Sequence, residues 1–498
     1  MNNLRENYIR LKNPHTIAIV EAHGEFTYTQ LHHAATTAAA NLLSGKPDLN
    51  EARVVFMAPP GFEYAAIQRG IWSAGGIALP LCLTHPLPEL EYVFQDVQPQ
   101  IAIAAPAYDE ILSALAAKYH CRLLHTAEVL ASAEAQLPEI SASRRALILY
   151  TSGTTSKPKG VVLTHGNLLA QIQTLLQAWE WQPQDHILHV LPLHHTHGIV
   201  NALGCALASG ATCEFLDKFE AKKVWQCFSA GRINLFMAVP TIYARLIAEW
   251  ENAPPETRRQ WSQACAHLRL MVSGSAALPV PVFEKWRQIS GQALLERYGM
   301  TEIGMALSHP VHGERKPGTV GMPLPGVSVR LVHESGETID AENIPGEIQI
   351  AGANVFQGYW NRIEATRAAF CDGWFRTGDI AVREEGYYRI LGRSSMDIIK
   401  TGGYKVSALE IEGILLEHES MKECAVVGVP DEEWGECVCV AAVLRPGAAL
   451  THDALRAWGK QRMAVYKIPS RLQLVESLPR NAMGKVVKPE VKKIFEGI

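Results

Sequence analysis

The 498-residue chain lacks several patterns, and each absence excludes a class of protein. Its 46 lysines and arginines do not outnumber its 50 aspartates and glutamates, so no basic field favours nucleic acid as a partner. The ten cysteines form no C-x-x-C pair, which argues against a zinc site and fits a reducing compartment. No apolar run approaches the ~18 residues of a membrane helix. The N-terminal segment has the composition of neither a secretory signal nor a transit peptide. We therefore expect a cytoplasmic protein that binds neither membranes nor nucleic acid.

Short β-branched runs alternate with longer helical patterns in the first third of the chain. The runs predict strands at 53–58, 100–105 and 146–152, and the spacing between them predicts helices at 63–74 and 109–119. Strands that alternate with helices indicate parallel, buried sheets, so we predict an α/β fold. Glycine-centred turns and short strands dominate after about Gly318, and a small α/β pattern resumes after residue 407. We predict a domain boundary at 392–397.

The segment "LYTSGTTSKPKG" (Leu149–Gly160) concentrates five serine and threonine side chains, two lysines and two glycines in one loop. Hydroxyls, backbone N–H groups and lysine charge are the components of a phosphate-binding loop. The segment lacks the Gly-Lys-Ser/Thr ending of the standard nucleotide P-loop. A solvated turn is the alternative, but a predicted buried strand leads into this loop. Ligands of α/β proteins gather at such carboxyl ends of strands.

Three later motifs carry polar groups that suit the same chemistry. In "RYGMTE", Glu302 could ligate Mg²⁺, which takes one or two carboxylates together with phosphate oxygens. In "GWFRTGDI", Asp379 could accept both hydroxyls of a ribose, although an aspartate in an ordinary turn is the alternative. In "RNAMGKVVK", Lys485 follows a glycine, and a surface lysine is the alternative. Each motif alone is a weak signal.

In this order and at these spacings, the four motifs resemble the adenylate-forming superfamily of acyl-CoA synthetases, luciferases and peptide-synthetase adenylation domains. The resemblance extends from Phe26 to Lys488. It implies that ATP activates a carboxylate as an acyl-AMP with release of pyrophosphate, and that the acyl group then passes to a thiol. It implies ATP, Mg²⁺ and coenzyme A as cofactors. It also implies a large N-terminal domain (1–392) of parallel and mixed sheets with helices and a distorted β-barrel region, and a small, mobile C-terminal α+β domain (393–498).

The resemblance also implies roles for individual residues. Lys485 is expected to bridge the acyl and α-phosphate oxygens and to stabilise charge as the carboxylate attacks phosphorus. Glu302 and Thr155 are expected to ligate the metal, and Thr301 to contact the α-phosphate. The other ATP- and AMP-binding positions are Thr151, Ser152, Gly153, Thr154, Thr155, Lys157 and Lys159 for the β- and γ-phosphates, Ser273, Gly274 and Ser275 for the wall of the adenine pocket, Tyr298, Gly299 and Met300 beside them, and Asp379 and Arg393 for the ribose.

The sequence departs from the family pattern at the hinge about which the small domain is expected to rotate. "GRSSMDIIK" is one residue longer than the usual spacing, so the hinge residue is Ser395 or Met396. In the second pose, "TGGYKV" is expected to form the thiol tunnel. The residues expected to bind coenzyme A there are Gly402, Gly403, Tyr404 and Lys405.

Two arginines suggest the acid that is activated. Arg245 lies in the helical stretch expected to wall the acyl pocket, and Arg297 immediately precedes Tyr298. A buried arginine must be paired, and a second carboxylate on the substrate could pair it bidentately. A structural ion pair with Glu296 is the alternative for Arg297, and plain exposure is the alternative for Arg245.

Four local sequences, "LPLHHTHGIVNAL", "FMAVPTIYARL", "VSGSAALP" and "ERYGMTE", resemble malonyl-CoA synthetases. This resemblance implies that Arg245 and Arg297 hold the distal carboxylate of malonate or methylmalonate. It also places His195 and His197 at the acyl pocket, where His195 orients the reacting carboxylate. A zinc site at "HHTH" is disfavoured because the ligand spacing and a thiolate or carboxylate partner are missing.

Three alternatives remain open at this point. One is a coenzyme A ligase for a small monocarboxylic or aryl acid, and another is an adenylation enzyme that loads a carrier protein in trans. A non-catalytic binding protein is disfavoured because the loop and all three later motifs are present. Small molecules are the expected partners of a monomer or weak homodimer.

Overall fold

The computed structural model describes residues 15–151, 158–402, 404–431, 434–480 and 484–495, and the predicted α/β fold is confirmed. The five early elements are observed close to their predicted bounds: β3 (Arg53–Met57), α3 (Phe62–Ser73), β5 (Ile101–Ala104), α5 (Asp109–Lys118) and β7 (Arg145–Thr151). Strands β4 (Ile77–Pro80) and β5 are buried along their whole length. Continuous burial of this kind is typical of parallel strands covered on both faces.

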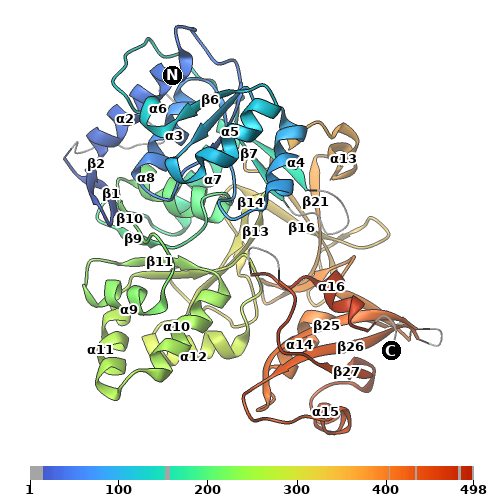
Figure 1. The fold of residues 1–498 in the computed structure, drawn as a ribbon. Helices are drawn as coiled ribbons and strands as arrows, with labels where there is room; N and C mark the ends of the chain where they lie inside the picture. Colours follow the sequence, from blue (N-terminus) through green and yellow to red (C-terminus); the bar gives the residue numbers. More distant parts are fainter. Residues whose placement is uncertain (1–14, 152–157, 403, 432–433, 481–483, 496–498) are drawn as a thin grey trace.

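Two large mixed sheets form the N-terminal part of the molecule (Figure 1). The first contains, in spatial order, β15 (Met322–Pro323), β14 (Gly304–Ser308), β13 (Leu295–Met300), β12 (Leu270–Ser273), β11 (Leu235–Ala238), β9 (His186–His189), β10 (Thr212–Phe215), β1 (Ile17–Glu21) and β2 (Gly24–Thr27). The second contains β19 (Gly358–Tyr359), β8 (Lys159–Thr164), β7, β4, β3, β5 and β6 (Arg122–His125). Strands β9, β11, β12 and β13 run parallel, so their carboxyl ends lie along one edge of the first sheet.

Helices cover these two sheets. The helix α2 (Tyr28–Leu43) begins with a capping box, in which Thr27 accepts a hydrogen bond from the Gln30 N–H and the Gln30 side chain accepts one from the Thr27 N–H. The remaining helices of this part are α4 (Leu87–Val97), α6 (Thr126–Val129), α7 (His165–Ala178), η2 (His197–Gly204, a π-helix), α8 (Cys205–Ser209), α9 (Ala221–Ser229), α10 (Pro240–Asn252), α11 (Pro255–Ala266), α12 (Val280–Ser290) and α13 (Ile363–Ala368), with a short 3₁₀ turn, η1 (Pro106–Tyr108).

A third sheet corresponds to the glycine-rich region in which the sequence predicted short strands and a distorted barrel. Its strands are β17 (Thr338–Ile339), β16 (Val327–Val332), β18 (Gly346–Gly352), β21 (Trp374–Glu384), β20 (Phe370–Cys371) and β22 (Tyr387–Arg393). The pairing of β21 with β22 sets Asp379 directly opposite Arg393. The third sheet therefore brings together two residues that are 14 positions apart in the sequence.

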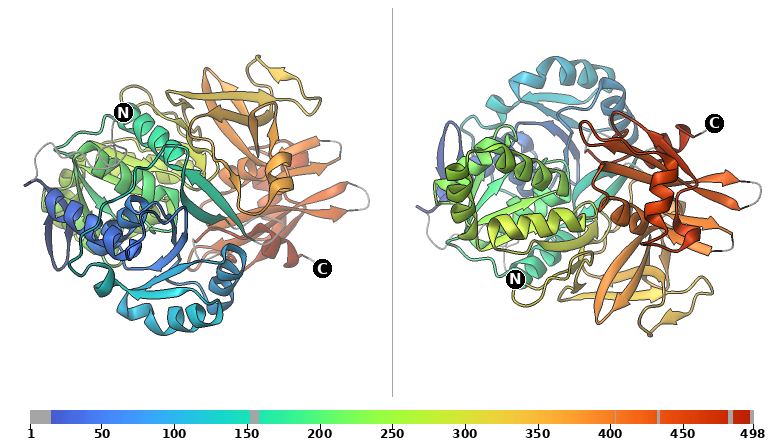
Figure 2. Two further views of the ribbon diagram at one scale, coloured as in Figure 1. Left: turned by 90° about the horizontal axis from the view of Figure 1, so that it is seen from above. Right: turned by 90° about the horizontal axis from the view of Figure 1, so that it is seen from below.

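The C-terminal segment forms its own sheet and its own apolar clusters. The strands are β24 (Tyr404–Ser407), β23 (Ile398–Thr401), β26 (Gly435–Leu444), β25 (Met421–Asp431) and β27 (Arg471–Leu474), with helices α14 (Ala408–Leu415), α15 (His452–Gly459) and α16 (Lys488–Lys493) and a 3₁₀ turn, η3 (Val465–Lys467). Both views in Figure 2 place this segment at one side of the molecule, next to the third sheet. Its buried side chains cluster with one another. A boundary at 392/393 stays a prediction that this packing supports.

Among the described residues, no helix is both long enough and apolar enough to cross a membrane.

Candidate active site

Several of the predicted site residues lie at the edge where the parallel strands of the first sheet end. β9 ends at His189 and leads into the loop that carries His195, while β12 ends at Ser273 and leads to Ser275. β13 carries Arg297–Met300 along the same edge. This arrangement is where open α/β sheets bind ligands. It divides into a nucleotide end, around Asp379, and an acyl end, around Arg297.

At the nucleotide end, the polar groups are paired with one another. The Tyr298 hydroxyl donates to Asp379 Oδ2 at 2.6 Å, and Arg393 Nε lies 3.2 Å from Asp379 Oδ1. Burial raises the pKa of Asp379, and the charge of Arg393 and the bond from Tyr298 oppose that rise. The pairing predicted for Asp379 and Arg393 is therefore present in the structure, and it presents a fixed carboxylate to a ligand.

Glu302 lies buried at the end of "RYGMTE" and accepts a hydrogen bond from the Tyr359 hydroxyl at 2.9 Å. Burial raises the pKa of this carboxyl group, while the Tyr359 bond and the charges of Arg393 and Lys159 lower it. Lys159 Nζ lies 5.0 Å from the centre of the Tyr359 ring, so the end of the phosphate-loop motif reaches Glu302. A carboxylate beside the expected phosphates fits the ligand preference of Mg²⁺.

The phosphate-loop motif is only partly within the described residues. Thr151 and Lys159 pair across the antiparallel strands β7 and β8, so the motif connects the two strands of a hairpin. The predicted residues that lie outside the described part of the chain are Ser152, Gly153, Thr154, Thr155 and Lys157. Their predicted roles, including metal ligation by Thr155, stay predictions.

Lys485 lies on the loop before α16 and reaches both ends of the site. Burial by the surrounding protein lowers its pKa, and the charges of Arg393 and Arg297 lower it further. Asp379 opposes this effect, and Lys485 in turn lowers the pKa of His195 and of His197. The C-terminal segment is therefore in a pose that presents Lys485 to the nucleotide and acyl ends together.

At the acyl end, the Arg297 side chain is buried and incompletely paired. Its Nη2 donates to Ser275 Oγ at 3.2 Å, whereas its Nε has no hydrogen-bond partner among the described residues. The guanidinium packs against Gly274, where a Cβ atom would come within 2.6 Å of it. Ser275 also lies 3.2 Å from His197 Nδ1 and has a φ of 69°, a conformation that a non-glycine residue adopts at a cost. Ser275, predicted for the adenine pocket, thus also supports the acyl end.

The alternative partner for Arg297, Glu296, is turned elsewhere. No ion pair joins the two side chains in the part of the chain that the structure describes. Glu296 Oε1 instead accepts from the Leu278 N–H at 3.3 Å, and burial raises the pKa of Glu296 to about 8. Burial lowers the pKa of Arg297. A buried cation with an unpartnered donor is the environment that an anionic ligand would complete.

Two histidines extend the set of unpartnered donors. His195 Nε2 and His197 Nε2 are buried without a hydrogen-bond partner in the described structure. Burial, followed by His194, Lys485 and His85, lowers the pKa of His195 to about 3. Burial, followed by Arg297 and neighbouring imidazoles, lowers the pKa of His197. Both rings are neutral at neutral pH and can donate to an anion without adding charge.

The second predicted acyl-pocket arginine has a different environment. Arg245 is exposed on α10, with its guanidinium carbon 5.8 Å from the centre of the Phe219 ring. Its predicted contact with the substrate stays a prediction.

The predicted coenzyme A segment lies on an exposed aromatic face of the C-terminal part. Tyr404 is half exposed and stacks on Tyr466, with ring centres 4.2 Å apart, and Gly402 packs against the Trp434 ring. Lys405 forms an ion pair with Glu334 at 2.6 Å, and Gly403 lies outside the described residues. Sequence reasoning missed Tyr466 and Trp434, because only the fold brings them beside Tyr404.

The predicted hinge is a tight turn. Asp397 N donates to the Arg393 carbonyl at 2.8 Å, and Asp397 Oδ2 accepts from the Arg393 N–H at 3.0 Å. Asp397 Oδ1 lies 3.0 Å from Lys488 Nζ, which ties the turn to α16. The predicted hinge residues Ser395 and Met396 lie within this turn, which the buried Asp397 closes, and their role as a hinge stays a prediction.

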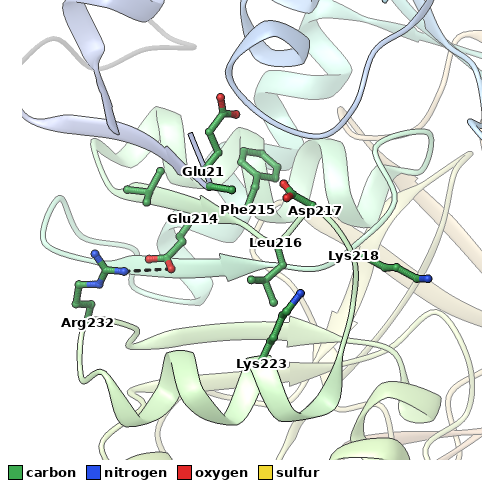
Figure 3. Close-up of a pocket in the computed structure, with 10 residues that line it drawn as sticks. Glu21, Glu214, Phe215, Leu216, Asp217, Lys218, Lys223 and Arg232 are labelled. Carbon is green, nitrogen blue, oxygen red and sulfur yellow. Dashed lines mark hydrogen bonds and ion pairs between the residues drawn. The ribbon is translucent and has the colours of Figure 1, made fainter. Parts of the chain in front are cut away.

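A separate hollow of about 360 Å³ lies at the carboxyl ends of β1 and β10 (Figure 3). Arg232 Nη2 lies 3.3 Å from Glu214 Oε1. His186 Nε2 lies 2.9 Å from Glu214 Oε2. Within this hollow, Glu214 therefore has a cationic side chain at ion-pair distance.

Family models, relatives and a solved structure match most of the chain. The family model described as AMP-binding enzyme matches residues 10–360, and the model described as AMP-binding enzyme C-terminal domain matches residues 410–485. The chain is 45% identical to the malonate–CoA ligase ACSF3, mitochondrial, of Homo sapiens, over 96% of this chain and 90% of that protein. It is 42% identical to a malonate–CoA ligase of Arabidopsis thaliana, over 91% and 79%. The crystal structure of ATP-bound MatB from Rhodopseudomonas palustris matches with a TM-score of 0.92 and 35% identity, covering 99% of each chain.

Proposed function

Because the chain belongs to the AMP-binding enzyme family, we propose that it ligates malonate to coenzyme A with ATP, through malonyl-AMP, releasing AMP and pyrophosphate. Methylmalonate is the second acid that the same site suits. The relatives named above as malonate–CoA ligases support the choice of acid. The observation that carries it within this chain is the buried Arg297 guanidinium, whose Nε has no partner in the described structure.

The acyl end sorts acids by their distal group. Arg297 binds the distal carboxylate. Ser275 contacts both the Arg297 guanidinium and His197, and it thereby keeps the guanidinium in position for the ligand. His195, neutral because of its burial, donates to the carboxylate that reacts. An acid without a second carboxylate leaves the buried cation unpaired, which costs about 1–3 kcal/mol or more for a charged group.

The nucleotide end and Lys485 carry out activation. Asp379 accepts the ribose hydroxyls, and Tyr298 and Arg393 keep its carboxylate in place. Lys485 stabilises the negative charge that develops when the acid's carboxylate oxygen attacks the α-phosphorus and pyrophosphate leaves. Mg²⁺, when bound, neutralises charge on the phosphate oxygens, and Glu302 is the described residue that would hold it.

Transfer to coenzyme A requires Lys485 to withdraw from the acyl-AMP. A rotation of residues 393–498 about the turn at Arg393–Asp397 would bring the face of Gly402, Tyr404 and Lys405 to the acyl end. In the pose of this structure, Tyr404 is exposed and Lys405 forms an ion pair with Glu334. Both features support a pose in which this face does not contact the acyl end. Cytoplasmic location and a monomeric or weakly dimeric state are retained as predictions.

An acid panel tests this proposal. Pyrophosphate release is measured with ATP, coenzyme A and either malonate, methylmalonate, succinate, acetate, octanoate or benzoate, and the acyl-CoA product is identified by mass. Malonate is expected to give the largest kcat/KM. Faster turnover of acetate, octanoate or benzoate would make the chain a ligase for a monocarboxylic or aryl acid. Acid-dependent ATP–pyrophosphate exchange without any acyl-CoA product would instead favour loading of a carrier protein.

A further inference from the structure

A cluster of nucleophilic and titratable side chains lies beside the acyl end and has no part in the reaction described above. Cys82 lies in the loop after β4, and its thiol is hydrogen-bonded to His194 and His85 and lies 3.4 Å from Thr84 Oγ1. His85 Nδ1 lies 3.2 Å from Glu89 Oε2. The Cys82 thiol, the His85 imidazole and the Glu89 carboxylate thus follow one another in contact, and these are the groups that activate a cysteine.

The charges in this cluster favour the thiolate. Burial raises the pKa of Cys82, but hydrogen bonds from His194 and His85 outweigh burial and lower this pKa to about 5. The bond to Cys82 raises the pKa of His85 in spite of burial, and Glu89 raises it further. Cys82 and His85 therefore favour each other's charged forms, and the thiolate is the reactive form of cysteine.

The cluster is joined to the acyl end through one histidine. The His194 ring lies 6.1 Å from the His85 ring and 4.2 Å from the His195 ring. His195 Nε2 is in turn buried and without a hydrogen-bond partner in the described structure. A change at the Cys82 sulfur therefore reaches the residue that orients the reacting carboxylate.

We propose that Cys82 is a modification site at which hydrogen peroxide oxidises the thiol and thereby weakens activation of the acid. The thiolate sulfur attacks one peroxide oxygen, an S–O bond forms and the O–O bond breaks. The departing hydroxide takes the proton of the His85 imidazolium and leaves as water. Sulfur gives up two electrons to the peroxide and becomes a sulfenic acid, which a low-molecular-weight thiol can reduce again.

Oxidation removes an anion and adds an atom in a confined place. Cys82 is only 6% exposed, so an added oxygen atom meets packed neighbours. The thiolate–imidazolium attraction is lost, because Cys82 is now a neutral sulfenic acid and His85 a neutral imidazole, and His194 must adjust to the added oxygen. The expected result is a higher KM and a lower kcat for the acid, with ATP binding unchanged. This effect on activity rests on the proposed function, whereas the reactivity of the thiol does not.

Labelling tests the reactivity without any assay of activity. The native protein is treated with iodoacetamide across a pH series, and each cysteine is followed by mass spectrometry. Cys371 is the internal control because it is exposed. Cys82 is expected to reach its half-maximal labelling rate at a lower pH than Cys371. His85→Asn, which keeps the thiol but removes its imidazole partner, is expected to move the Cys82 profile to higher pH. A Cys82 that stays unlabelled, or that follows the pH profile of Cys371, contradicts the proposal.

Matched serine variants test the consequence. Cys82→Ser is expected to retain acid-dependent pyrophosphate release and to lose it about tenfold more slowly in hydrogen peroxide than wild type. Cys371→Ser should be inactivated at the wild-type rate, and dithiothreitol should restore both wild type and Cys371→Ser. Inactivation of Cys82→Ser at the wild-type rate would overturn the assignment. If none of the acids tested is activated, the proposed function fails, and the labelling profiles of wild type and His85→Asn still decide whether Cys82 is the reactive thiol.

Discussion

The nucleotide end and the acyl end of the site are both buried, but they differ in how their polar atoms are paired. Asp379 is held by Tyr298 and Arg393 at hydrogen-bonding distances before any ligand is considered. Arg297, by contrast, has a single described hydrogen bond, to Ser275, and its Nε has no partner within the described residues. His195 and His197 each leave a buried ring nitrogen unpartnered beside it.

The difference in pairing distinguishes groups that any adenylation reaction needs from groups that select one acid. A fully paired carboxylate is a fixed feature that any bound nucleotide meets in the same geometry. Buried donors without partners carry a free-energy cost that only a ligand of complementary charge and shape removes. The nucleotide end therefore indicates the chemistry, and the acyl end indicates the acid.

The largest effect is expected where the two ends meet, at Lys485. Replacing it with alanine removes the cation that stabilises charge on both the acyl and α-phosphate oxygens. Acid-dependent ATP–pyrophosphate exchange should fall ~10²–10³-fold, as for the loss of other electrostatic donors. Transfer from synthetic malonyl-AMP to coenzyme A should remain near the wild-type rate. Equal loss of both half-reactions would show that Lys485 serves the fold or the second step instead.

Arg297 tests the acyl end alone. Arg297→Ala removes the buried cation, and kcat/KM for malonate should fall on the order of 10²-fold because a charge-assisted pair is lost. The dissociation constant for ATP, measured by calorimetry, should be unchanged. Arg245→Ala is the matched control for a charge that lies exposed on α10. A larger effect from Arg245→Ala than from Arg297→Ala would reverse the roles that burial gives the two arginines.

The sequence predicted the nucleotide end better than the acyl end, and the reason is physical. Asp379 and Arg393 face each other across two adjacent strands, so local motifs with turn signals place them. Tyr359, Ser275 and Cys82 contact residues that are distant in the sequence and adjacent only in the fold. No spacing in the sequence predicts that His85 and His194 both contact the Cys82 thiol. Burial also distinguishes Arg297 from Arg245, and periodicity alone did not separate them. Five of the residues predicted to bind phosphate lie outside the described residues, so that prediction stays untested.

Asp379 tests the nucleotide end alone. Asp379→Asn keeps the shape but removes the charge that pairs with Arg393, and the asparagine accepts the ribose hydroxyls less strongly. KM for ATP should rise about tenfold, consistent with ~1.5 kcal/mol for a hydrogen bond to a charged group. The order of preference among acids should not change. A change in acid preference would mean that the two ends are coupled through the Tyr298–Arg297 backbone and cannot be treated separately.

The smallest expected effect is the pH dependence of ATP–pyrophosphate exchange, which involves Lys485, the residue between the two ends. Surrounding protein, Arg393 and Arg297 lower the pKa of Lys485, so its ammonium loses a proton at a lower pH than an ordinary lysine does. Activation needs the charged form, which is present below the pKa, so exchange should decline as the pH rises through that lowered value. A decline of a few-fold between neutral and moderately alkaline pH is expected, roughly what a one-unit titration allows. Lys485→Arg keeps its charge at alkaline pH, so its residual exchange should show no such decline. The same alkaline decline in Lys485→Arg would assign the titration to another group, because guanidinium does not titrate in that range.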